Sequence, residues 1–278
     1  MSASTRQDEP RRIVHRTTGA TNGMITRLMS PGDLGERLKP FVFLDLFDDG
    51  GRPFNDFGLH PHSGIATLTY ILEGRVTYED TNGANGLLEA GGVEWMQAGK
   101  GVWHGGGGAG APRTRGYQLW IALPPVTELG ASVSHYQSAG EIPVSGPARV
   151  LLGSHAGVSS SIEAPSPIIY LAVTLSPGES WTFEPQAGHE VLWAAVASGK
   201  LEGDAPIGNG ELAVFDGGAG SVTFTAAERT EFVLGSAAPH GHELVLGHYS
   251  VHTSAEALRI GEANIDELGR VLRQRSQP

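Results

Sequence analysis

Residues 57–74 read Phe-Gly-Leu-His-Pro-His-Ser-Gly-Ile-Ala-Thr-Leu-Thr-Tyr-Ile-Leu-Glu-Gly, and this stretch indicates the type of fold. Residues 65–73 are rich in β-branched and aromatic side chains, which favour a strand, and Gly74 closes it. His60 and His62 stand just before that strand in a segment that we expect to be extended. Alternate residues of an extended segment point to the same face, with Cβ atoms roughly 6–7 Å apart. The stretch therefore predicts a buried strand preceded by two imidazoles on one face.

Similar short segments occur along the whole chain of 278 residues. Glycine (40 residues) and proline (17) make up about a fifth of the sequence, well above average usage, which indicates many tight turns. Short strands at intervals of about 8–12 residues with turns between them predict an all-β fold of sandwich or barrel type. The predicted strands cover residues 25–28, 41–47, 65–73, 75–79, 86–89, 93–97, 117–123, 143–155, 168–175, 180–184, 190–197, 210–215, 221–225 and 231–235.

The two halves of the sequence share a pattern. An apolar strand ends in Glu-Gly at Gly74 and continues Arg-Val-Thr-Tyr, and another ends in Ser-Gly at Gly199 and continues Lys-Leu-Glu-Gly. Each is followed by a glycine-flanked turn and a further strand. We interpret this as two copies of one β-barrel unit, with chance similarity as the alternative.

The C-terminal region predicts helices instead of strands. Thr253 with Glu256, and Asn264 with Glu267, each match the spacing of a capping box. We expect two short helices that pack across the sheets and contribute no chemistry.

Composition restricts the class of protein. The net charge is −11 and the pI is near 5.4, which argues against binding to nucleic acids or anionic membranes. Cysteine is absent, so disulfides, thiolate metal sites and cysteine nucleophiles are excluded. Residues 1–12 are polar, without the apolar core of a secretory signal, and we expect them to form a loose tail. No apolar run of 18 residues is present, so we expect a cytoplasmic protein without a membrane span.

A third histidine could join the first two. His104 follows the glycine-rich segment 98–103, which we expect to turn the chain back antiparallel to 93–97. His60, His62 and His104 at the mouth of a small barrel would then form a three-imidazole face. Imidazole ligands suit Fe(II), Cu, Ni, Mn or Zn, so they do not select the metal. The alternative is that a His-x-His pair in a loop rich in glycine and proline is incidental.

Three segments carry a family resemblance. Residues 57–74 closely resemble the signature of the pirin family, as do Gly-Val-Glu-Trp-Met-Gln-Ala-Gly-Lys-Gly-Val-Trp-His at 92–104 and Gln-Leu-Trp-Ile-Ala-Leu-Pro at 118–124. The resemblance extends to 41–47, to Tyr136-Gln137 and, more faintly, to 239–271, so it covers most of the chain.

The resemblance implies a bicupin, that is, two cupin β-barrels with a short C-terminal helical extension. On this basis we expect an N-terminal, metal-bearing cupin at 13–135 and a C-terminal cupin with the helical extension at 136–278. Pirins hold one metal, commonly iron, through three His and one Glu, and the His ligands fall here on His60, His62 and His104. The expected cofactor is thus a divalent metal, with Fe(II) the first choice. Some pirins resemble quercetin 2,3-dioxygenases, which implies a flavonol-type aromatic substrate.

The sequence departs from the family at the fourth ligand. The family's Glu lies two residues after the third His, where this chain has Gly106 within a run of four glycines. Without this carboxylate the site has one more open position and lacks a local general base. Glu94 could replace the ligand, although we expect it to face away or to lie behind the site. The glycine run itself is either a flexible loop that has lost its function or a widening of the barrel mouth.

Three functions are compatible with these residues. The first is a metal-dependent cupin, with dioxygenase activity as the expected reaction. The second is a non-catalytic binding or regulatory protein with a weak or empty metal site, which acts through a protein partner. The third is a cupin that binds a small organic ligand without metal.

The other histidines give a weaker signal. His189 precedes the strand of the second half that corresponds to 67–74, but no third His follows there. We expect the C-terminal histidines to be surface or packing residues, with a second metal site as the alternative; they are His240, His242, His248 and His252.

Overall fold

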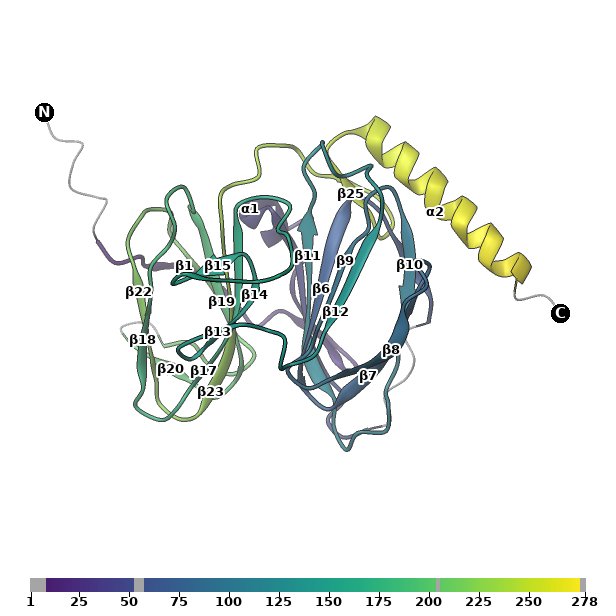
Figure 1. Ribbon diagram of the computed structural model, residues 1–278. Helices are drawn as coiled ribbons and strands as arrows, with labels where there is room; N and C mark the ends of the chain where they lie inside the picture. Colours follow the sequence, from purple (N-terminus) through teal and green to yellow (C-terminus); the bar gives the residue numbers. More distant parts are fainter. Residues whose placement is uncertain (1–8, 53–57, 204–205, 276–278) are drawn as a thin grey trace, which may run out of the picture. The chain divides into compact units, whose positions relative to one another are not determined.

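The computed structural model describes residues 9–52, 58–203 and 206–275 and consists mainly of β-strands (Figure 1). Of the expected loose tail at 1–12, positions 1–8 lie outside the described residues, and so does Phe57 of the first motif. The described end of that tail is not loose, because Arg11 is buried and donates to the carbonyl of Glu190 at 3.2 Å.

The chain forms two compact units, each assembled from two separate parts of the sequence. The first barrel comprises Thr21–Glu141 and His240–Pro278, and the second comprises Met1–Ala20 and Ile142–Pro239. This division differs from a single cut between residues 135 and 136. The reason is that strand β1 (Ile13–Thr17) pairs with β21 (Leu212–Phe215), whereas the C-terminal helix α2 (Ala255–Arg275) packs against β10 (Val102–Gly105). The N-terminal strand β1 thus belongs to the second barrel, and the C-terminal helix α2 belongs to the first.

The first barrel is a sandwich of a large and a small sheet. The large sheet has the order β12-β9-β6-β11-β4-β3-β2, and the small one has the order β5-β10-β7-β8. Their strands, together with the short pair β24-β25 and helix α1, are β2 (Ala20–Asn22), β3 (Ile25–Met29), α1 (Leu34–Leu38), β4 (Phe41–Asp48), β5 (His60–His62), β6 (Ile65–Glu73), β7 (Arg75–Asp80), β8 (Asn85–Glu89), β9 (Val93–Gln97), β11 (Arg115–Ala122), β12 (Val133–Gln137), β24 (Val245–Leu246) and β25 (Val251–His252).

The second barrel has the same plan. Its large sheet has the order β1-β21-β19-β23-β17-β14-β13, and its small sheet has the order β18-β22-β20. Its remaining strands are β13 (Val144–Ser145), β14 (Ala148–Leu152), β15 (Ser154–His155), β16 (Val158–Ser159), β17 (Ile168–Leu175), β18 (Ser180–Phe183), β19 (Val191–Ser198), β20 (Leu201–Glu202), β22 (Val222–Ala226) and β23 (Thr230–Ala237).

The internal repeat is confirmed in atomic detail. In both large sheets the strand that precedes the shared glycine is flanked in the same way, with β6 between β9 and β11, and β19 between β21 and β23. Gly74 and Gly199 both have positive φ, at 79° and 82°. A Cβ at Gly74 would lie 2.8 Å from Thr114 Oγ1, and one at Gly199 would lie 2.6 Å from Thr230 Oγ1. The two glycines are therefore required by the same turn and the same close approach.

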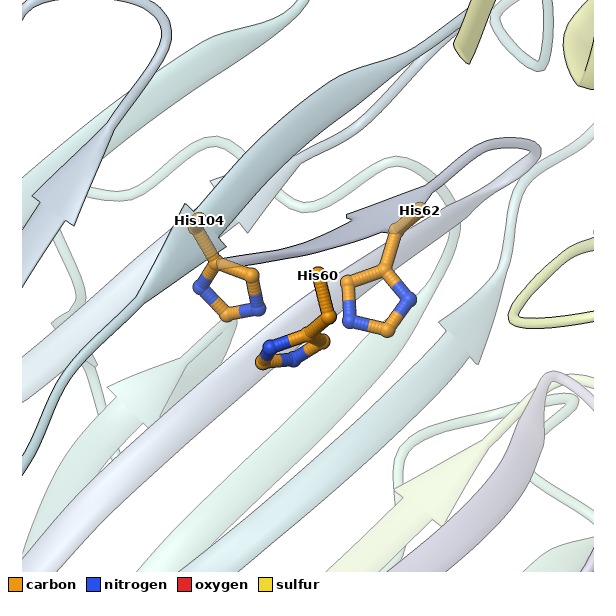
Figure 2. A group of neighbouring side chains, drawn as sticks. All are labelled: His60, His62 and His104. Carbon is orange, nitrogen blue, oxygen red and sulfur yellow. The ribbon is translucent and has the colours of Figure 1, made fainter. Parts of the chain in front are cut away.

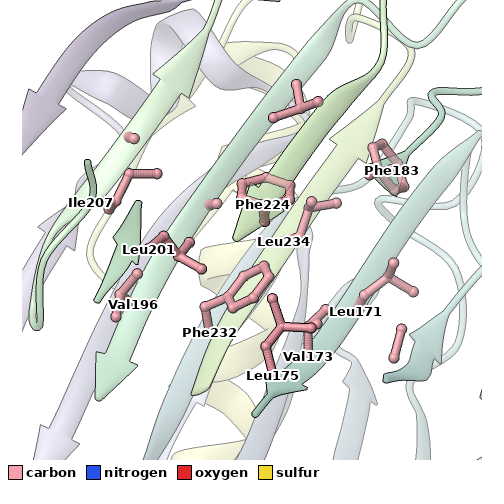
Figure 3. Close-up of a cluster of buried hydrophobic side chains, with 14 of the residues drawn as sticks. Leu171, Val173, Leu175, Phe183, Val196, Leu201, Ile207, Phe224, Phe232 and Leu234 are labelled. Carbon is pink, nitrogen blue, oxygen red and sulfur yellow. The ribbon is translucent and has the colours of Figure 1, made fainter. Parts of the chain in front are cut away.

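The cores lie between the sheets of each sandwich. In the second barrel, side chains of both sheets interlock, among them Leu171, Val196, Phe224 and Phe232 (Figure 3). In the first barrel, Phe47, Ile71 and Leu88 form a buried cluster from both sheets. This arrangement follows from alternating inward-facing residues along each strand.

Several expected elements differ from the structure. The segment 143–155 is not one strand but β13, β14 and β15, because turns interrupt it around 146–147 and at Gly153. The two short C-terminal helices are a single helix of 21 residues, so Asn264 lies inside it and starts no second helix. The amide of Ala257 donates to Ser254 Oγ, so Ser254 caps this helix in place of the predicted Thr253.

The strand that carries His104 also pairs differently from the prediction. β10 does not return along 93–97 but crosses to the small sheet, where it pairs antiparallel with β5 and β7.

Neither helix in the described part of the chain combines the length and the apolar character that crossing a bilayer requires.

Candidate metal centre

The pairing of two short strands places the three predicted histidines together. In the antiparallel register of β5 and β10, His104 lies opposite His60, and Val102 lies opposite His62. The alternation expected for 60–62 holds, since both imidazoles of β5 face the ring of His104 (Figure 2). The ring centroids of His60, His62 and His104 are 4.5–5.1 Å apart.

These imidazoles can converge on one point. One ring nitrogen from each of His60, His62 and His104 lies within 4.8 Å of the corresponding atoms of the other two. The Nε2 atoms of His62 and His104 are buried and have no hydrogen-bond partner. A buried polar atom without a partner is destabilising unless something else satisfies it. A group that accepts nitrogen lone pairs, such as a metal ion, would satisfy both atoms at once.

The other ring nitrogen of each histidine is already occupied. His60 Nδ1 donates to the carbonyl of Gly58, His62 Nδ1 donates to the carbonyl of Tyr249, and each distance is 3.0 Å. His104 Nδ1 donates to Glu94 Oε1, also at 3.0 Å. Since the proton of each neutral ring is on Nδ1, all three Nε2 atoms carry lone pairs. Metal-binding histidines are oriented in this way by their outer hydrogen bonds.

Burial disfavours the protonated form of two of the rings, His60 and His62. Burial, followed by the proximity of His104, lowers the pKa of His60 to about 4. The same causes, with His60 added, lower the pKa of the fully buried His62 well below its ordinary value. Neutral imidazole is the form that binds a metal ion, so these two rings are ready to act as ligands at neutral pH.

Glu94 is placed behind the site and not on it. Its side chain is buried, with Oε1 accepting from His104 Nδ1 and Oε2 accepting from Thr69 Oγ1 at 2.9 Å. Burial raises the pKa of Glu94, but the charge and hydrogen bond of His104 and the bond from Thr69 outweigh it, and the pKa lies below its usual value. The carboxylate therefore places negative charge next to His104 without facing the three Nε2 atoms.

The glycine run beside His104 is closely packed, contrary to the view of it as a flexible loop. The amide of Thr77 donates to the carbonyl of Gly107 at 2.8 Å, and the amide of Gly107 donates to Thr77 Oγ1 at 3.1 Å. A Cβ at Gly106 would lie 2.1 Å from the carbonyl oxygen of Thr77, and a Cβ at Gly105 would lie 2.7 Å from that of Gly58. Glycine is required here because neighbouring backbone approaches too closely for a side chain.

Sequence reasoning missed one residue of this region, Tyr249. Its carbonyl orients His62, and its ring centroid lies 5.9 Å from that of His60 and 6.0 Å from that of His62. Its φ of 64° is unusual for a bulky residue. No local motif indicated this role, because 187 positions separate Tyr249 from His62.

The remaining histidines form no second centre. The described residues contain one group of three or more metal-binding side chains at suitable distances, and it is the one built on His60. His189 is buried, and its Nδ1 lies 3.2 Å from Ser236 Oγ. Of the C-terminal histidines, His240 and His252 are buried and the other two are exposed.

The second barrel carries different side chains on the two strands that correspond to β5 and β10. Its strands β18 and β22 pair as β5 and β10 do, with Trp181 opposite Phe224. These rings stack with centroids 6.0 Å apart, and Trp181 packs against the apolar core that contains Phe183 and Phe224. The strand pair β18 and β22 thus carries aromatic side chains and no histidine, whereas β5 and β10 carry three imidazoles.

The donor set fits a divalent transition metal. Three imidazoles oriented by hydrogen bonds at Nδ1, two of them with buried Nε2 atoms that have no partner, match the ligands that such ions prefer. Cysteine is absent from the sequence, which removes sites of the thiolate type.

Comparisons with known proteins agree with this geometry. The family model described as Pirin matches residues 23–121. A pirin-like protein of Caulobacter vibrioides is 32% identical over 242 residues, which cover 82% of each chain.

Solved structures match the fold over most of the chain. Quercetin 2,3-dioxygenase from Acinetobacter baumannii superposes with a TM-score of 0.83 at 23% identity, covering 94% of this chain and 98% of its own. Bacterial pirin YhhW from Escherichia coli, solved in complex with nickel(II), has a TM-score of 0.65 at 19% identity, covering 83% and 98%. The fold is therefore a bicupin, as the resemblance implied.

Proposed function

Because the chain belongs to the pirin family, we propose that it binds one divalent transition metal through His60, His62 and His104 and oxidises a flavonol-type aromatic with dioxygen. The observation that carries the proposal is the set of three converging Nε2 atoms, two of them buried without a partner. Fe(II) is our first choice of metal, and the nickel(II) complex of the Escherichia coli relative supports a site that accepts other divalent ions.

The chain's own residues would hold and orient the metal. Gly58, Tyr249 and Glu94 fix the three imidazoles by accepting their Nδ1 protons. When bound, the metal would supply Lewis acidity and redox capacity to a coordinated oxygen ligand. The half-buried His60 marks the side of the cluster that is closest to solvent, and it is there that we expect a ligand to enter.

The ligand set also suggests the charge of the substrate. Three neutral imidazoles leave the two positive charges of the ion uncompensated among its direct ligands, and Gly106 provides no carboxylate. Glu94 balances part of this charge, but only from behind His104. We therefore expect the site to prefer an anionic oxygen ligand, such as the ionised hydroxyl of a flavonol.

The absence of a general base at position 106 has a further consequence. Among the described residues, the buried carboxylate nearest the cluster is Glu94, and both of its oxygens are engaged by His104 and Thr69. The substrate proton would then have to leave before binding or pass to water. Turnover should accordingly increase with pH as the substrate hydroxyl ionises.

Gly106 also favours a second candidate function. A metal bound without a carboxylate ligand is held less strongly, and a chain with a weak site could act as a non-catalytic binding or regulatory protein. This alternative requires a protein partner and predicts no oxygen consumption.

One experiment separates the two functions. Metal is measured per chain by elemental analysis, on protein purified without a histidine tag and after anaerobic loading with Fe(II). His104→Ala is the test variant, and His135→Ala, which replaces an exposed histidine outside the cluster, is the matched control. We expect close to one equivalent in the parent and the control and almost none in the test variant.

Oxygen uptake with a flavonol then tests catalysis. Uptake that requires His104 supports the dioxygenase, whereas bound metal without uptake leaves the regulatory alternative. A parent that stays free of metal after loading refutes the proposal.

A further inference from the structure

A second polar cluster is buried next to the metal centre. Ser63 follows the ligand His62, and its Oγ lies 2.8 Å from Ser250 Oγ and 3.0 Å from His252 Nε2. His252 Nδ1 donates to Glu128 Oε2 at 3.0 Å. Glu128 also accepts from the amide and hydroxyl of Thr253 at 2.7 and 2.6 Å.

The order serine, histidine, carboxylate is that of a hydrolytic triad, but the packing excludes such a role. Ser63, His252 and Glu128 are 0%, 1% and 3% exposed. A Cβ on Gly261 of helix α2 would lie 2.5 Å from His252 Nε2 and 2.6 Å from Ser63 Oγ. No substrate atom can approach the serine, so the chain of hydrogen bonds serves another purpose.

The buried polar cluster holds the segment that contains Tyr249 in place. Ser250 and Ser63 form a parallel bridge, and the amide of Val251 donates to the carbonyl of Ser63 at 3.3 Å. One residue earlier, the carbonyl of Tyr249 accepts the Nδ1 proton of His62. Segment 249–253 is thereby tied to the strand that carries two of the candidate ligands.

This contact requires an unfavourable backbone conformation at Tyr249. Its φ of 64° lies in the left-handed region, which is unfavourable for residues with a Cβ. Such conformations persist where the surroundings fix them, and they occur often at functional sites. Here the hydrogen bonds on its C-terminal side, from Ser250 to Thr253, fix it.

We propose that the C-terminal segment completes the metal centre: Tyr249 is a positioning residue whose carbonyl sets the orientation of His62, and the Ser63–His252–Glu128 chain holds that carbonyl. The proposal rests on the metal-binding part of the proposed function. It implies that metal binding and docking of segment 249–253 are coupled. By thermodynamic linkage, each must strengthen the other by the same factor.

The test measures Ni(II) affinity of the full-length chain by calorimetric titration. Glu128→Gln keeps the size of the side chain, but its amide group cannot accept at both of its former oxygen positions. We expect it to weaken Ni(II) binding about 10–100-fold, the usual effect of removing an outer partner of a ligand.

Two controls separate positioning from general loss of stability. Glu89→Gln changes an exposed carboxylate and should leave affinity unchanged. Val196→Ala creates a cavity in the second barrel and should lower stability without lowering affinity.

A readout independent of affinity is hydrogen exchange. In the parent, saturation with Ni(II) should slow exchange of the Val251 and Thr253 amides by the factor by which Glu128→Gln weakens binding. Equal Ni(II) affinity of Glu128→Gln and the parent overturns the proposal alone, because metal binding is then intact without the coupling. A parent that binds no Ni(II) refutes the proposed function and the present inference together.

Discussion

Restoring the family carboxylate by the substitution Gly106→Glu should damage the site instead of completing it. The first atom of any side chain at position 106 would lie 2.1 Å from the carbonyl oxygen of Thr77. Contact at an ordinary distance of 3.4 Å requires the two segments to separate by about 1.3 Å. That movement breaks the two hydrogen bonds that the backbone amides of Thr77 and Gly107 donate to one another's residues.

The expected magnitude follows from these contacts. Overpacking of a closely packed site costs about 1–3 kcal/mol, and each lost hydrogen bond adds about 0.5–1.5 kcal/mol. The free energy of unfolding should therefore fall by about 2–6 kcal/mol. Because β10 pairs with β7 at His104 and Gly105, the separation also displaces His104, and Ni(II) affinity should fall.

The assay is urea-induced unfolding of the metal-free chain, followed by Ni(II) titration of the folded protein. Gly106→Ala should lose nearly as much stability as Gly106→Glu, since the clash begins at Cβ. Gly140→Ala is the matched control, because a Cβ there meets no atom within 4 Å. The reasoning is refuted if Gly106→Glu unfolds at the urea concentration of the parent and binds Ni(II) more tightly.

Three further outcomes are expected. Glu94→Gln preserves shape and the hydrogen bond to His104 while removing the charge, and should weaken Ni(II) binding about 10–100-fold in calorimetric titration; unchanged affinity would show that the charge is irrelevant. Because burial lowers the pKa of His60 to about 4, the unfolded chain binds more protons than the native one between about pH 4 and 6.5, so metal-free protein should lose stability as pH falls through that range. Urea unfolding of the parent and His60→Gln tests this, since the difference between them should change with pH only in that window. Gly261→Ala should destabilise the protein despite better helix propensity, because the added Cβ would lie 2.5 Å from His252 Nε2, and a raised melting temperature would contradict this contact.

The comparison of sequence and structure separates local from non-local information. The strands 65–73, 93–97 and 168–175 have the predicted bounds, because short apolar runs rich in β-branched residues and the turns between them are local signals. The repeat around Gly74 and Gly199 was also readable, since both turns need positive φ and a close approach to a threonine. His60 and His62 share a face because they are two residues apart on a strand.

Other features arise only when distant segments pack together. Three such features depend on partners far along the chain. They are the pairing of β10 with the small sheet, the assignment of each chain end to a barrel, and the single helix α2 in place of two predicted helices. No local pattern encodes such partners.

The sequence by itself determined the class of fold, the three candidate ligands and the missing carboxylate at Gly106, because residue identity and short spacing carry that information. Only the tertiary structure decided that Gly106 is closed to any side chain, that Glu94 lies behind His104 and that Tyr249 orients His62. The physical reason is that tautomer, charge and steric room at a site are set by atoms brought there by long-range packing.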